Sequence, residues 1–127
     1  MKTNTLLTTT SLLSILLMTL HVTDDIVRGL SRAGADNAFG VVIFVVWLFG
    51  TLALAERRAG YVIMLLGGLF AAAMPILHMR GAHYVAIVKS SGGFFFVWTL
   101  LAVGVTGTFA VLLSARALWS LRLGKPR

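Results

Sequence analysis

The sequence contains no cysteine, and it is poor in charged residues, above all acidic ones. Without cysteine the chain can form no disulfide, thiolate metal site or thiol redox centre. Only 12% of the 127 residues are charged, against about 25% in a typical soluble domain. Asp and Glu together number 4 while Lys and Arg number 11, which leaves a formal net charge of +7. This composition argues against a soluble domain.

Asp, Glu, Lys, Arg and His are also missing from four long apolar stretches. These stretches, separated by short polar loops, cover residues 6–20, 38–55, 60–77 and 94–115. A helix needs about 20 apolar residues to cross a hydrocarbon core of ~30 Å. We therefore predict an all-α integral membrane protein, with a single domain over residues 1–127 folded as an antiparallel bundle of four transmembrane helices. The expected spans cover about residues 5–28, 38–56, 59–79 and 93–118.

The lack of charge inside these stretches also bears on function. A proton- or cation-coupled transporter usually carries an ionisable residue within a spanning helix, because the coupling charge must be reached from both sides. The sequence therefore argues against such a transporter. The basic residues flank the apolar stretches and form no contiguous patch. We expect the lipid bilayer, and not nucleic acid, to be the partner of this positive charge.

The flanking charges are divided unequally between the two ends of the predicted bundle. One end has 7 basic residues and 1 acidic residue, and the other has 4 basic and 3 acidic residues. The positive-inside rule places the more basic end in the cytoplasm. We therefore expect a multi-pass protein of the cell membrane, the inner membrane of a prokaryote, with both termini cytoplasmic and the histidine-containing loops outside.

A polar stripe follows the first apolar stretch. Its members are spaced i, i+3, i+4 and i+7, and so share one face of a helix: His21, Asp24, Asp25 and Arg28. Gly29 follows as a helix stop. We predict that the first helix extends beyond the outer membrane surface to about Arg28. We also predict that the stripe turns inward, burying His21 and Asp25 and facing the third and fourth spans.

Two more histidines belong to the same predicted end: His78 after the third apolar stretch, and His83 five residues later. We predict a ligand-binding site made of His21, Asp24, Asp25, Arg28 and His78. Imidazole and carboxylate groups are common ligands of transition metals. The candidate ligands of a divalent metal are His21, Asp25, His78 and His83. A haem held axially by His21 and His78 is a second possible cofactor.

These features favour a binding protein over an enzyme. We expect a small binding module or accessory subunit that presents the outer site to a ligand, an ion or a partner protein. The alternatives are a metal- or haem-dependent membrane enzyme or redox protein, an oligomeric channel, and a plain solvated helix end with no site. Small residues such as Gly67, Gly68 and Ala71 predict close helix contacts. A homo-oligomer or a larger membrane complex is a further expectation.

Overall fold

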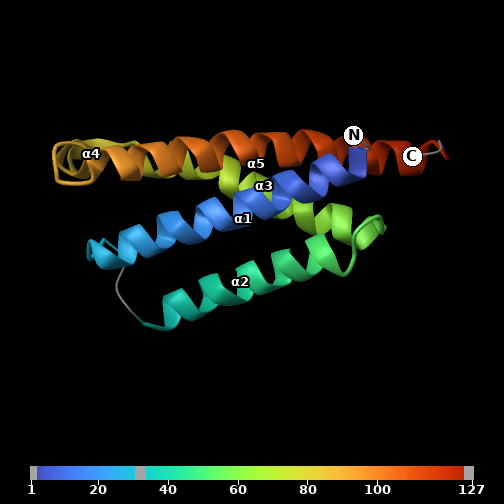
Figure 1. Ribbon diagram of the computed structural model, residues 1–127, viewed down its shortest axis with the longest axis horizontal. Coiled ribbons are helices and arrows are strands. Elements are labelled where there is room, and N and C mark those ends of the chain that lie inside the picture. The colour runs from blue at the N-terminus through green and yellow to red at the C-terminus, as the bar shows by residue number, and fades with distance from the viewer. Residues whose placement is uncertain (1–2, 31–33, 125–127) are drawn as a thin grey trace.

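The computed structural model describes residues 3–30 and 34–124, and within these ranges every regular element is a helix (Figure 1). The prediction of an all-α protein is therefore confirmed for this part of the chain. The helices are α1 (Thr3–Val27), α2 (Ala35–Leu52), α3 (Arg58–His78), α4 (Gly81–Val88) and α5 (Gly93–Arg122). Side chains are described throughout except at residues 35, 36 and 81–83.

Three helices are long and apolar enough to cross a membrane, namely α1 with 25 residues, α3 with 21 and α5 with 30. At a rise of 1.5 Å per residue, even α3 is about 32 Å long, which matches a hydrocarbon core of ~30 Å. The apolar part of α2, Asn37–Leu52, is shorter. The three long helices are compatible with a multi-pass membrane protein.

Two helices end at other residues than the expected spans. The second helix ends at Leu52 and not near residue 56, because the chain turns there and Glu56 has a positive φ of 67°. That left-handed conformation cannot continue a right-handed helix. The last helix extends to Arg122, one turn past the expected end. The first helix ends at Val27, and Gly29 has a φ of 70°, as expected for a glycine stop.

Small residues let α3 and α5 lie close together. A Cβ atom added at Gly107 would lie 2.6 Å from the Cβ of Ala71, and one added at Gly68 would lie 3.0 Å from the carbonyl oxygen of Gly107. Gly67 is covered by the indole ring of Trp47. The predicted close packing at Gly67, Gly68 and Ala71 is thus confirmed, and it allows the dispersion contacts that hold helices together in lipid.

A buried circuit of hydrogen bonds attaches α2 to α1. The indole N–H of Trp47 donates to the Ser11 hydroxyl (2.9 Å), and the Thr51 hydroxyl donates to the Trp47 carbonyl (2.9 Å). Ser11 therefore donates to the Thr51 oxygen, 2.8 Å away. All three side chains are buried. Interhelical bonds of this kind contribute on the order of 1 kcal/mol each in a membrane protein.

The two ends of the molecule differ in chemistry. At one end, Tyr61 donates to the Asn4 side chain (2.8 Å), which in turn donates to Glu56 (3.1 Å), so the starts of α1 and α3 lie together. The end of α5 lies at this same end (Figure 1). We call it the arginine end, after Arg57, Arg58 and Arg122. The opposite end, the histidine end, holds the end of α3, the short helix α4 and the start of α5 (Figure 1).

Candidate metal centre

His21, Asp25 and His78 meet at the histidine end. His21 and Asp25 are one turn apart on α1 and are 0% and 8% exposed, while His78 is the last residue of α3. The Asp25 Oδ2 atom lies 3.6 Å from Nε2 of His78 and 3.9 Å from Nε2 of His21. The predicted inward turn of the stripe is confirmed, which excludes the plain solvated helix end for these residues.

Hydrogen bonds at the far side of each ring decide which histidine nitrogen carries the proton. Nδ1 of His78 lies 3.1 Å from the carbonyl oxygen of Met74. A carbonyl can only accept, so this Nδ1 is the protonated nitrogen. In the neutral ring, Nε2 then keeps its lone pair and directs it at Asp25.

His21 is oriented in the same way by α5. Its Nδ1 lies 3.4 Å from the hydroxyl oxygen of Thr99, whose own proton is donated to the carbonyls of Phe95 (2.9 Å) and Phe96 (3.0 Å). The hydroxyl therefore accepts from His21, and Nδ1 again carries the proton. Fixing the tautomer through the outer nitrogen is the usual way in which a protein prepares a histidine for a metal.

When both rings are neutral, three electron-pair donors thus converge with no proton donor among them. The Nε2 atom of His21 and the Oδ1 atom of Asp25 are buried and have no hydrogen-bond partner within the described part of the chain. A buried polar atom left without a partner costs about 1–3 kcal/mol. A cation held between the three groups would remove this cost, because it attracts the carboxylate and both lone pairs together.

The distances fit a single small ion. The three candidate ligand atoms all lie within 4.8 Å of one another. Tetrahedral ligands at about 2.1 Å from a zinc ion are about 3.4 Å apart. Movements of about 1 Å or less would therefore complete a site.

The same geometry speaks against haem. The two imidazole rings meet edge to face, with centroids 5.3 Å apart and planes at 78°. Axial ligands must lie on opposite faces of a macrocycle, and rings already in contact leave no gap for one. The arrangement of His21 and His78 therefore favours a small ion over haem.

The surroundings of the cluster are apolar on one side and open on the other. The Phe96 ring lies against His21 with centroids 5.1 Å apart, and Met18 is fully buried nearby in the same core. On the other side, a pocket of about 200 Å³ borders Asp25 and His78 and is also lined by Arg80 and Tyr84. Three protein ligands beside such a pocket leave a coordination position that water or a small ligand could take.

The remaining predicted site residues lie beside the cluster. Arg28 Nε pairs with Asp24 (2.7 Å), and Arg28 Nη1 donates to the Ser90 hydroxyl (3.2 Å) and the Ser91 carbonyl (3.0 Å). These contacts fasten α1 to the turn between α4 and α5. Asp24 and Arg28 therefore help to connect α1 with this turn. Their role in ligand binding stays a prediction. The His83 side chain lies outside the described residues, so its predicted role also stays a prediction.

Thr99 is the site residue that sequence reasoning missed. Its hydroxyl is fully buried in α5 and holds the His21 ring. The available signal was a polar residue in an apolar stretch, nearly two turns after the start of the last helix. That signal is weak, because threonines in membrane helices commonly bond back to their own helix.

Comparison with known proteins leaves the function to be argued from this geometry. No family model matches the chain, and no curated protein or solved structure matches it at a significant level.

Proposed function

We propose that this protein is a small membrane-embedded binding module whose ligand is a divalent transition metal ion of the zinc type. His21, Asp25 and His78 would supply the ligands. The observation that carries the proposal is the convergence of two oriented Nε2 atoms on one carboxylate, with two of the donor atoms buried and unpartnered. Neutral imidazole and carboxylate ligands suit zinc and similar ions, whereas magnesium prefers oxygen ligands and bound water.

Direct metal binding tests the proposal. Purified protein in detergent would be stripped with a chelator, dialysed and titrated with Zn²⁺ by calorimetry, and its metal content measured by mass spectrometry. We expect one ion per chain. His21→Ala, Asp25→Asn and His78→Ala should each weaken binding by about 100-fold or more, since even an outer hydrogen-bond partner of a ligand contributes about 10- to 100-fold.

Asp24→Asn is the matched control, because it removes the same charge from the neighbouring position and leaves the three ligands in place. Its affinity should stay within about threefold of the unmodified protein. His83→Ala asks whether that histidine is a fourth ligand. Equal losses in Asp24→Asn and Asp25→Asn would contradict the proposed site, as would the absence of stoichiometric metal in the unmodified protein.

The membrane arrangement is part of the proposal. We infer four spans in an antiparallel bundle, with α2 as the fourth, and both termini in the cytoplasm, so that the metal centre lies at the outer leaflet. Two observations support this. The 18 residues of α2 have a length of about 27 Å at 1.5 Å per residue, and the basic residues gather at the arginine end.

A topology reporter tests this arrangement. An enzyme that folds only outside the cytoplasm should be inactive when fused after Arg127 and active when inserted between Gly29 and Asn37. The reverse pattern would place the histidine end in the cytoplasm and would contradict the proposed orientation. Activity at both positions would contradict the even number of spans.

The pocket beside the metal centre favours a second candidate, a metal-dependent membrane enzyme or receptor for a small anion. Arg80 would contribute the positive charge, and the open coordination position would accept the anion. Replacement of the metal by Co²⁺ makes the ligand sphere visible by absorption. Azide should change the cobalt spectrum of the unmodified protein and change it less in Arg80→Ala. An unchanged spectrum would favour the simple binding module.

A further inference from the structure

A second concave surface lies far from the metal centre, at the arginine end. A groove of about 930 Å³ runs between the start of α3 and the end of α5. Its walls are largely apolar on the side toward the middle of the helices and basic at the rim. The principal lining residues are Arg58, Val62, Leu65, Leu118, Trp119 and Arg122.

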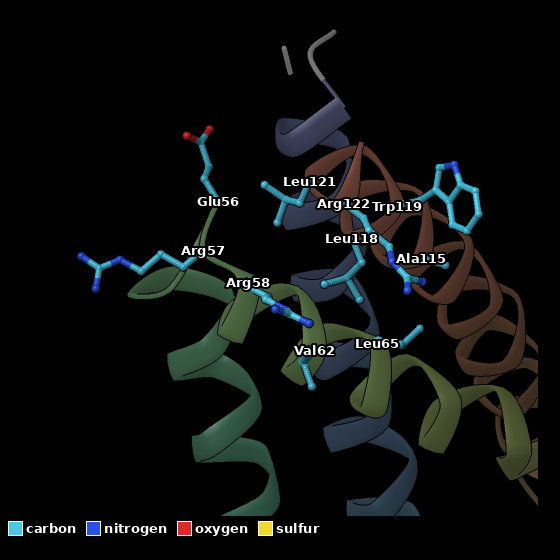
Figure 2. Close-up of a pocket in the computed structure, with 10 residues that line it drawn as sticks. All are labelled: Glu56, Arg57, Arg58, Val62, Leu65, Ala115, Leu118, Trp119, Leu121 and Arg122. Atoms are coloured by element: carbon cyan, nitrogen blue, oxygen red, sulfur yellow. The ribbon is translucent and has the colours of Figure 1, made fainter. Parts of the chain in front are cut away.

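Two arginines from different helices face this groove. Figure 2 shows the Arg58 and Arg122 side chains extended toward the apolar wall around Val62 and Leu118. The Arg57 side chain extends the opposite way (Figure 2). Within residues 3–30 and 34–124, no hydrogen bond or ion pair involves the Arg58 or Arg122 guanidinium.

Glu56 is the acidic residue that lines the groove, and within the described part of the chain it forms no ion pair with Arg58 or Arg122. Its carboxylate accepts a hydrogen bond from Asn4 of α1 (3.1 Å). Two guanidinium groups therefore line one concave surface, and neither forms an ion pair with a carboxylate of the described residues. Arginine forms strong paired hydrogen bonds with phosphate, so this charge pattern is complementary to a phosphate group.

We propose that the groove binds one anionic glycerophospholipid, with its phosphate at Arg58 and Arg122 and its acyl chains along Val62 and Leu65. The apolar wall is what selects a lipid over a free phosphate ion. Val62 is 39% exposed and continues into the exposed outer surface of α3 at Leu66, which is 60% exposed. A free anion would leave this wall uncovered, whereas an acyl chain would cover it and lie in the bilayer.

Trp119 supports the same occupant. It lines the groove beside Arg122 and is 61% exposed. Tryptophan concentrates at the headgroup level of membranes, because its ring is apolar and its N–H is polar. Basic pockets between spanning helices are a recurrent form of anionic lipid site. The basic rim, the tryptophan and the apolar wall of the groove therefore follow one another in the same order as the phosphate, the interfacial region and the acyl chains of a phospholipid.

Native mass spectrometry tests the proposal in detergent. Delipidated protein would be titrated with phosphatidylglycerol and with phosphatidylcholine of identical acyl chains. We expect one phosphatidylglycerol per chain to bind at least about tenfold more tightly than phosphatidylcholine. In the double variant R58A/R122A, phosphatidylglycerol binding should weaken by about 30-fold, or about fivefold for each arginine removed near an anionic lipid.

Arg116→Ala, compared with Arg122→Ala, is the matched control. Arg116 is exposed, lies on α5 like Arg122, and is not among the residues that line the groove. The affinity of Arg116→Ala should fall less than about threefold. An equal loss in Arg116→Ala and Arg122→Ala, or equal binding of the two lipids, would overturn the proposal. So would displacement of phosphatidylglycerol by millimolar inorganic phosphate, which would indicate a site for free anions.

A measurement on the unmodified protein avoids any effect of these substitutions on folding. In bilayers, phosphatidylglycerol with brominated chains should quench tryptophan fluorescence more strongly than brominated phosphatidylcholine at the same mole fraction. The difference should disappear in Trp119→Phe, where Trp47 and Trp98 remain as a common background. Equal quenching by both lipids would overturn the proposal. The groove and the metal centre lie at opposite ends, so either proposal can fail without the other.

Discussion

His21 and His78 belong to different helices, yet their rings meet edge to face with centroids 5.3 Å apart. Asp25 lies within 4 Å of both, at 3.9 Å from His21 and 3.6 Å from His78. Neither α1 nor α3 holds all three groups, so the cluster exists only while the two helices keep their relative position. The chemistry at this end of the protein therefore depends on helix packing.

Zinc should stabilise the folded protein against heat. A ligand that binds only the folded state stabilises it by about 2.7 kcal/mol at 100 times its Kd. Thermal unfolding in detergent, followed with and without Zn²⁺ after chelation, should show a higher midpoint with the metal. His78→Ala should lose most of this increase and Asp24→Asn should keep it. An equal increase in His78→Ala would place the bound metal elsewhere.

Thr99→Val should weaken metal binding without removing a ligand. The substitution deletes the hydroxyl that orients His21, and such outer partners contribute about 10- to 100-fold to affinity. Thr106→Val is the matched control, because Thr106 is also on α5 and its hydroxyl bonds back to the carbonyl of Ala102 (2.9 Å), away from the site. Calorimetric titration with Zn²⁺ compares the two. Equal affinities would show that Thr99 does not orient the ligand.

Metal affinity should fall as the pH is lowered. Histidine must lose its second proton to bind a metal, so protons compete with Zn²⁺ at His21 and His78. Between about pH 7.5 and about pH 5.5, where histidine changes charge, affinity should drop by at least about tenfold. Titrations at several pH values measure this, and Asp24→Asn should follow the same curve. A flat profile would contradict imidazole ligands.

Gly107→Leu should destabilise the fold, whereas Gly40→Ala should not. A Cβ atom at Gly107 would lie 2.6 Å from both the Ala71 Cβ and the Ala72 backbone nitrogen, and a larger side chain would push α3 and α5 apart. Such overpacking costs about 1–3 kcal/mol. Gly40 is also helical but has open space at the same position. Unfolding midpoints should separate the two variants, and equal midpoints would contradict tight packing at Gly107.

The order of elements and the polar stripe could be predicted without the structure. An apolar stretch of about 20 residues without charge has few alternatives to a helix. The 3.6-residue period then places His21 and Asp25 on one face, and Gly29 ends the helix because a glycine tolerates positive φ. The end of α2 could not be predicted in this way, since hydropathy continues through Ala53, Leu54 and Ala55 while the backbone turns.

The amino-acid sequence by itself determined that this protein is helical and apolar, which residues share a helix face, and that the two ends of the predicted bundle differ from each other in charge. Each of these properties can be read from short segments of the chain taken one at a time. Only the tertiary structure decided that the stripe turns inward, that His78 and Thr99 meet His21, and that Arg58 and Arg122 line one groove. These relationships join separate helices, and the position of Arg58 relative to Arg122 depends on the close packing of α3 and α5 at Gly68, Ala71 and Gly107.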